Sequence, residues 1–211
     1  EQVAHQVECG MTEQQIATNI QATLATKDIR SPVTLVATDQ RVFKYRHPLP
    51  TSKKMDKYGM LVTSATRHGL YVSLTRLVHL GAPISELQAK SEACAEIDAM
   101  AISLTKVGAP VSQIFHAVVD AYKRHGYVDE WKLHHQGGAG GYRAREYFAE
   151  FDSPFTVHSG QTFAWNPSIT GVKSEDTILT GKSANNILTA TGNWPQISTT
   201  ASIDRPAILE L

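Results

Sequence analysis

Residues able to do acid–base or ligand-binding chemistry gather in three short segments of the sequence. The first contains His47 within Arg-His-Pro, the second is a glycine-rich run with histidines and arginines at 134–145, and the third is Ser-Glu-Asp-Thr at 174–177. An imidazole suits proton transfer because its pKa lies near neutrality. Arginine guanidinium groups bind carboxylates through paired hydrogen bonds. These segments are therefore the candidates for acid–base catalysis and for binding an anionic group.

Several well-known catalytic motifs do not fit the sequence. The glycines at 137–141 are not followed by the Gly-Lys-Ser/Thr of a phosphate-binding loop, and Arg143 stands where GxGxxG requires its third glycine. We interpret these glycines as allowing close strand approach or a bulge. A serine hydrolase would need a nucleophile-elbow motif around its catalytic serine. None of the candidate serines, Ser64, Ser73 and Ser174, lies in such a motif.

Two adjacent histidines, His134 and His135, precede the glycine-rich run. If they lie on a strand, their side chains point to opposite faces of the sheet. The pattern therefore predicts that they do not bind the same metal ion.

Composition and charge narrow the class of protein. Apolar residues make up 42% and charged residues 19% of the 211 residues, which is typical of one globular domain. Lysine plus arginine balance aspartate plus glutamate at 20 each, so we expect neither nucleic acid nor a membrane as partner. Cys9 and Cys94 form no CxxC pair, and we expect two reduced thiols in a cytoplasmic protein.

The elements that must position these residues follow from periodicity. Thr12-Glu13-Gln14-Gln15 fits a capping box and begins a predicted helix over 12–26, and Ser85-Glu86-Leu87-Gln88 fits a second box that begins a long amphipathic helix. Another helix, around 114–122, ends near Gly126. The remaining segments predict a loop at 46–50 and strands over 32–37, 60–65, 70–80, 155–158, 161–166 and 171–180. We conclude that the chain is one α+β domain.

The order of the landmarks resembles one known family. The landmarks occur in this order: Gly-Met-Thr-Glu at 10–13, His47-Pro48, Thr75-Arg76, two long helices, the glycine-rich strand, Asn166-Pro167 and Glu175-Asp176-Thr177. In this order the sequence resembles the catalytic domain of the pita-bread family, which includes prolidases, Xaa-Pro and methionine aminopeptidases and creatinases. The resemblance covers the chain from near its start to its end. It implies a curved antiparallel sheet covered by helices. It also implies a homodimer. Because the chain begins at Glu1 without Met, we expect the C-terminal part of a longer chain with its first helix truncated.

The resemblance also identifies the positions of the family's metal ligands, which are two aspartates, a histidine and two glutamates. Only Glu175 is retained, and four ligands are replaced, at Val62, Ser73, Gly137 and Asn166. One carboxylate cannot hold a catalytic divalent ion against water. The resemblance therefore predicts a domain without its dinuclear metal site and without a cofactor.

Two residues are the candidates for catalysis. The resemblance implies that His47 faces the pocket and acts as an acid/base, as in the creatinase branch. The alternative is a histidine that only orders the turn at 48–50. Glu175 is a candidate for anchoring a cationic substrate group or orienting His47, and its alternative is an ion pair with Lys173 or an arginine.

Other residues are candidates for binding substrate. Arg143 and Arg145 share one strand face if the glycine-rich segment continues as a strand, and they would bind an anionic ligand. The alternative is that they face solvent and pair with nearby acidic residues. Three further residues complete the predicted binding set, namely Ser73, Asn166 and Tyr142. Tyr142 is a possible pocket-lining residue, although such aromatic residues more often pack in the core or at a rim.

Three functions remain open from the sequence. The first is a metal-independent hydrolase of a small C–N bond substrate, with a small molecule or short peptide as ligand. The second is a non-catalytic binding module, and the third is a metal-dependent Xaa-Pro aminopeptidase or prolidase. Loss of turnover in His47→Ala would distinguish the first from the second.

Overall fold

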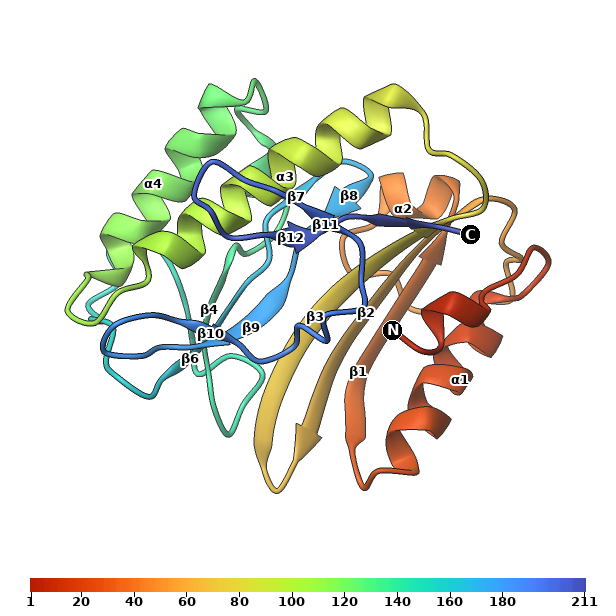
Figure 1. The fold of residues 1–211 in the computed structure, drawn as a ribbon, viewed down its shortest axis with the longest axis horizontal. Coiled ribbons are helices and arrows are strands. Elements are labelled where there is room, and N and C mark those ends of the chain that lie inside the picture. The colour runs from red at the N-terminus through yellow and green to blue at the C-terminus, as the bar shows by residue number, and fades with distance from the viewer.

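The computed structural model describes all residues from 1 to 211 and confirms the α+β class (Figure 1). Helices α1 to α4 span Glu13–Ala25, Gln40–Lys44, Ser85–Leu104 and Val111–Arg124, and the 3-10 turns η1 and η2 span Ala4–Gln6 and Glu130–Leu133. No helix is both long enough and apolar enough to cross a membrane.

The strands form two principal sheets. The four-stranded sheet has the order β1 (Arg30–Thr38), β2 (Tyr58–Arg67), β3 (Leu70–His79) and β13 (Ile208–Glu210), with β13 parallel to β3 and the other pairs antiparallel. The antiparallel five-stranded sheet has the order β10 (Asn186–Ile187), β9 (Asp176–Leu179), β6 (Thr162–Trp165), β4 (Gly137–Gly140) and β5 (Tyr147–Phe148). Two small ribbons pair β7 (Ser168–Ile169) with β8 (Val172–Lys173) and β11 (Gln196–Ile197) with β12 (Arg205–Pro206).

The two principal sheets meet where β3 passes β9. The backbone N–H of Ser73 donates to Thr177 Oγ1 at 2.7 Å, and that hydroxyl donates back to the Ser73 carbonyl at 2.9 Å. The Thr75 N–H donates to the Glu175 carbonyl at 3.0 Å. These bonds hold the Ser-Glu-Asp-Thr segment against the middle of β3, in the long hairpin formed by β2 and β3.

Helices cover the sheets on separate sides. Figure 1 shows α1 beside β1 and the pair α3–α4 above the strands of the five-stranded sheet. One apolar cluster of 28 buried residues joins α3 and α4 to both sheets, and a smaller cluster of 10 joins α1 to the hairpin and the C-terminal strand. This α1 cluster includes Ile16 and Val36, both fully buried.

Most predicted elements are confirmed, and three differ. Thr12 makes the predicted capping box, with its Oγ1 accepting from the Gln15 N–H while Gln15 Oε1 accepts from the Thr12 N–H. The second box is wrong: Ile84 is the N-cap and makes no side-chain bond. The predicted strand at 155–158 is only a single bridge between Thr156 and Pro110.

The third difference matters for the site. The predicted strand over 171–180 is two strands, β8 and β9, separated by Ser174 and Glu175. The condition under which Arg143 and Arg145 would share a strand face is not met, because β4 ends at Gly140 and a turn follows. Breaks in pairing at these places leave side chains free to face a cavity.

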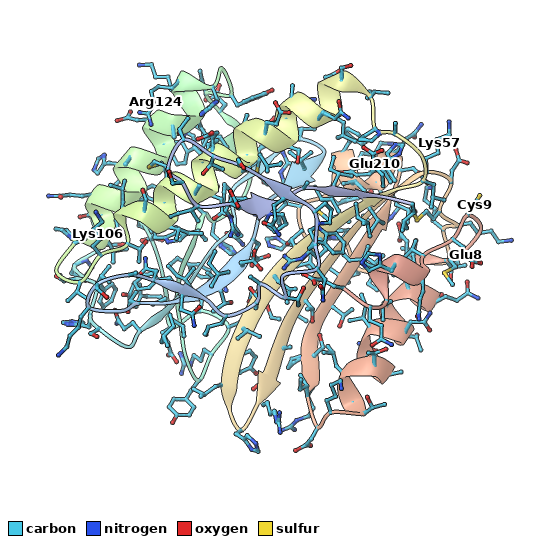
Figure 2. All side chains as sticks on the ribbon, viewed as in Figure 1. Glu8, Cys9, Lys57, Lys106, Arg124 and Glu210 are labelled. Carbon is cyan, nitrogen blue, oxygen red and sulfur yellow. The ribbon has the colours of Figure 1, made fainter.

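Both cysteines are free, in agreement with the sequence-based prediction. Cys94 is buried in the core, whereas Cys9 is exposed at the edge of the molecule beside Glu8 (Figure 2).

Candidate functional site

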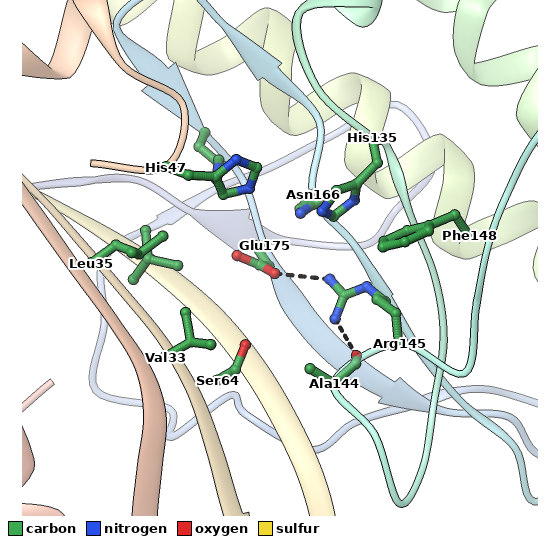
Figure 3. A pocket seen from close by; sticks show the side chains of 12 residues that line it. Val33, Leu35, His47, Ser64, His135, Ala144, Arg145, Phe148, Asn166 and Glu175 are labelled. Atoms are coloured by element: carbon green, nitrogen blue, oxygen red, sulfur yellow. Dashed lines mark hydrogen bonds and ion pairs between the residues drawn. The ribbon is translucent and has the colours of Figure 1, made fainter. Parts of the chain in front are cut away.

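A cavity of about 350 Å³, hereafter the pocket, opens where the two sheets meet. Figure 3 shows His47 on one side, His135 and Phe148 on the other, and Glu175 between them. The hairpin and β1 supply an apolar wall, and the remaining wall is polar. The residues that give the pocket its chemistry are His47, His135, Arg145, Asn166, Lys173 and Glu175.

An ion pair lies at the base of the pocket. Arg145 Nη2 donates to Glu175 Oε1 at 3.0 Å, and Arg145 Nη1 donates to Ser73 Oγ at 3.1 Å. The other carboxylate oxygen of Glu175 accepts from the Thr75 hydroxyl at 2.7 Å. The guanidinium group therefore bridges β3 and the segment before β9.

Lys173 adds a second cation to the same wall. Its ammonium group is buried, and its one hydrogen bond is to the Arg46 carbonyl oxygen at 3.2 Å. Burial lowers the pKa of Lys173, while the Glu175 carboxylate raises it in partial compensation. With Arg145 and Lys173 both protonated, two cationic groups face one carboxylate, which leaves a positive excess in the pocket.

The loop that carries His47 is fixed at both ends by a buried carboxylate. Glu13, at the start of α1, accepts from the backbone and hydroxyl of Thr38 and of Thr51, and it pairs with Arg41 at 3.0 Å. Beside His47, Arg46 pairs with Glu130 at 2.6 Å. These contacts connect α1, the His-Pro loop and η2.

His47 lines the pocket with a solvent-exposed ring, and its surroundings favour the uncharged form. Partial burial lowers its pKa below the ordinary value, and the positive charges of Lys173 and Arg145 lower it further, while Glu175 acts in the opposite direction. A neutral imidazole has a free lone pair and can accept a proton. The structure therefore places a candidate base in a pocket of positive charge.

The imidazole rings of three histidines stack beside one another. The rings of His134 and His135 lie 5.3 Å apart and are nearly parallel, and His47 lies 5.4 and 5.6 Å from them. The prediction that His134 and His135 point to opposite faces is wrong, because they lie between η2 and β4, where no strand pairing enforces alternation. Burial is the main cause that lowers the pKa of His135 to about 3 and that of His134 further still.

The residues present do not fit the family's two metal ions. Val62 and Asn166 line the pocket with Glu175, but neither supplies a charged oxygen, and Ser73 is bonded to Arg145. At Gly137 a Cβ atom would lie 2.2 Å from the Ala164 carbonyl oxygen, so no side chain fits there. No group of three or more His, Cys, Asp or Glu residues in the structure could hold a metal ion. The guanidinium group instead supplies positive charge at the surviving carboxylate.

Some predicted binding residues lie outside the pocket. Tyr142 is 76% exposed and packs over Gly69, and Arg143 is exposed in the turn after β4. The sequence-based analysis missed Lys173 as a binding residue and gave it only as an ion-pair partner of Glu175. Its position two residues before the retained glutamate was the available signal, since alternate residues of an extended segment share a face.

Comparison with known proteins supports the same fold. The structure is similar to the X-Pro aminopeptidase of Thermotoga maritima (TM-score 0.83, 18% identity, covering 100% of this chain and 58% of that one). It is also similar to the prolidase of Pyrococcus furiosus (TM-score 0.82, 18% identity, covering 90% of this chain and 58% of that one). A third similar structure is the N-terminal domain of the FACT complex subunit SPT16 from chickpea (TM-score 0.72, 12% identity, covering 87% of this chain and 50% of that one). This chain therefore spans between one half and three fifths of the length of these proteins.

The sequence comparisons give the family. No curated protein matches the chain. The profile of metallopeptidase family M24 matches residues 1–182, which is most of the chain and includes every residue of the pocket. Together with the curved antiparallel sheets and the order of elements, this match shows that the chain belongs to metallopeptidase family M24 and has its pita-bread fold.

Proposed function

We propose that this domain binds a small carboxylate-bearing molecule in the pocket and hydrolyses a C–N bond in it without a divalent metal ion. The observation that carries the proposal is the arrangement of the His47 imidazole, the Arg145 guanidinium and the Lys173 amine around a single cavity. Hydrolysis of the C–N bond would then use positive charge from side chains in place of that from metal ions.

The binding half of the proposal rests on charge. Arg145 is held rigidly by Glu175 and Ser73, and Lys173 has no carboxylate within ion-pair distance. A ligand carboxylate would balance the excess positive charge and accept hydrogen bonds from both groups. Asn166, which is 3% exposed and has an unpartnered Oδ1, is available for a ligand N–H.

The catalytic half rests on His47. As a neutral base, the ring would take a proton from water while the hydroxide oxygen bonds to the carbon of the C–N group. The Lys173 ammonium group makes one hydrogen bond in the structure, so a further N–H of this group would stabilise the negative charge that develops on that carbon's oxygen or nitrogen substituent. The C–N bond then breaks, and the leaving nitrogen takes the proton from His47. Glu175 serves as a positioning residue that orients Arg145.

A binding module without catalysis is the second candidate. Its specific support is that no hydrogen bond in the structure orients the His47 ring, whose neighbours are two stacked imidazoles. The chickpea neighbour of the same fold is, by its description, a subunit of a complex. In this case the pocket would recognise a ligand and leave it unchanged.

The experiment compares turnover and binding in chelator-treated protein. N-acyl amino acids, guanidino acids and dipeptides are assayed with wild type, His47→Ala and His47→Gln, and metal content is measured by elemental analysis. We expect wild-type turnover in metal-free protein and a loss of about 10²–10⁴-fold in kcat for both variants. The dissociation constants and melting temperatures should stay close to those of wild type.

Two outcomes would change the assignment. Activity that appears only with manganese, cobalt or zinc and survives His47→Ala would overturn the metal-independent mechanism. Carboxylate binding without any turnover would leave the binding module as the function.

A further inference from the structure

A second cavity, of about 580 Å³, lies next to the pocket and is lined mainly by aromatic rings. We call it the aromatic cavity. Its walls come from α4, η2, the segment between η2 and β4, and β5 with the segment that follows it. Its ring-bearing residues are Phe115, Trp131, His134, His135, Phe148 and Phe151. The pocket described above is polar and cationic, so the two cavities differ in chemistry.

The rings of the aromatic cavity form an ordered cluster. Phe151 meets Phe115 edge-to-face at 4.8 Å and Trp131 at 5.5 Å, and Trp131 meets Phe115 at 6.0 Å. Phe151 is nevertheless 44% exposed. Edge-to-face packing is the arrangement that aromatic groups prefer with one another. A further ring entering the cavity would bury exposed apolar surface in a preformed site.

The two cavities share part of their walls. His135 and Phe148 line both of them, and their rings lie 4.4 Å apart. Figure 3 shows both side chains next to Arg145, on the side of the pocket opposite His47. A molecule with its carboxylate at Arg145 would pass these two rings if it reached the aromatic cavity.

We infer that the pocket and the aromatic cavity hold one ligand, an amide with a carboxylate on one side of the C–N bond and an aromatic ring on the other. This inference rests on the proposed function and specifies its substrate class. The carboxylate binds at Arg145 and Lys173, the amide lies beside the rings of His47 and His135, and the ligand's ring packs against Phe151 and Trp131.

The rim of the aromatic cavity distinguishes two kinds of such amide. Glu150 and Asp152 are both exposed at this cavity, and neither carboxylate is in an ion pair, whereas the cation that lines the cavity, Lys132, is paired with Asp129. An amino group next to the ring, as in a dipeptide that begins with phenylalanine, would be attracted to them. An N-acyl amino acid has no such group and would rely on the ring alone.

The test uses pairs of ligands that differ by one phenyl ring. N-benzoylglycine is compared with N-acetylglycine, and Phe-Gly with Gly-Gly, by NMR titration of the whole chain. We expect each aromatic member to bind about tenfold more tightly or better, because burial of the ring removes apolar surface from water. A gain for Phe-Gly that exceeds the gain for N-benzoylglycine identifies the amino group as part of the recognised ligand.

Matched variants locate the effect. Phe151→Ala should reduce the affinity for N-benzoylglycine to that for N-acetylglycine. Phe155→Ala is the control, because Phe155 is similarly exposed at 41% but packs on Tyr147 outside both cavities, and it should leave both affinities unchanged. Melting temperatures report whether either variant is unfolded.

The possible failures are distinguishable. Equal affinities within each pair, or an aromatic preference that survives Phe151→Ala, would overturn the inference and leave the proposed carboxylate site intact. If no member of either pair binds to wild type, the proposed function itself fails.

Discussion

Two neighbouring carboxylates, Glu175 and Asp176, lie in charged networks of opposite character. Asp176 accepts from Arg76 at 3.0 Å and from Arg205 at 2.8 Å, and Arg205 also pairs with Asp98 at 2.8 Å. All four of these side chains are at most 4% exposed. Glu175, in contrast, faces the pocket with Arg145, and Lys173 lies on the same wall without a carboxylate partner.

The difference separates a structural role from a binding role. In the Asp176 network, Asp98 and Asp176 match the two guanidinium groups, and the Glu1 carboxylate also pairs with Arg76 at 2.8 Å, so no positive charge is left in excess. The network joins β3, α3, β9 and β12. In the Glu175 network, positive charge exceeds negative charge beside an open cavity. A balanced buried network holds elements together, whereas an unbalanced one at a cavity attracts a ligand of opposite charge.

Removal of the carboxylate from the balanced network should have the largest effect on stability. Asp176→Ala leaves Arg76 and Arg205 buried without their common partner, and we expect it to lower the free energy of unfolding by about 3–5 kcal/mol. Urea denaturation measures the loss. Asp129→Ala, which breaks an exposed pair with Lys132, is the control and should cost at most about 0.5 kcal/mol. A loss below about 1 kcal/mol for Asp176→Ala would contradict the structural role.

The unbalanced network should respond chiefly in binding. Arg145→Gln removes a charged donor, and we expect affinity for a small carboxylate to fall by about 30-fold, equivalent to ~2 kcal/mol. Because this variant leaves Glu175 buried without its partner, Arg145→Gln/Glu175→Gln is the matched variant. The double variant should regain melting temperature without regaining affinity. Recovery of binding in the double variant would exclude Arg145 as the anchor.

Acid should destabilise the histidine stack. His134 and His135 have lowered pKa values in the folded protein, His135 to about 3, whereas an unfolded histidine titrates near 6.5. Between these values the unfolded chain binds more protons, so stability is complete above about pH 6.5 and falls by about 1 kcal/mol per pH unit for each histidine as pH decreases.

Urea denaturation across this pH range checks the expectation. His135→Asn should flatten the pH dependence, because a neutral amide has no proton to gain. A profile as steep as that of wild type would assign the acid sensitivity to other groups.

The smallest effects are expected in the turn after β4. Arg143→Ala and Tyr142→Ala remove exposed side chains that lie outside the pocket, and each should change stability by no more than about 0.5 kcal/mol. Their carboxylate affinities should equal that of wild type in the same titration used for Arg145. A loss of affinity in Arg143→Ala would show that both arginines of this segment bind ligand.

Much of the fold followed from local pattern. The capping box at Thr12, the long hairpin and helices α3 and α4 were predicted because caps and periodic apolar residues act within one element. The strands after residue 130 were predicted less well. They are only two to four residues long, and tertiary packing decides where such short pairs form.

For the site, the sequence by itself determined the residue types. Through the resemblance it predicted that Val62, Ser73, Gly137 and Asn166 stand where the family has ligands and that Glu175 remains, and it made His47 and Arg145 candidates. Only the tertiary structure decided that Arg145 reaches Glu175 while Arg143 does not, that Lys173 faces the pocket, and that three imidazoles stack. The reason is physical: charge and residue type are local properties, whereas direction and burial of a side chain depend on segments far away in the sequence.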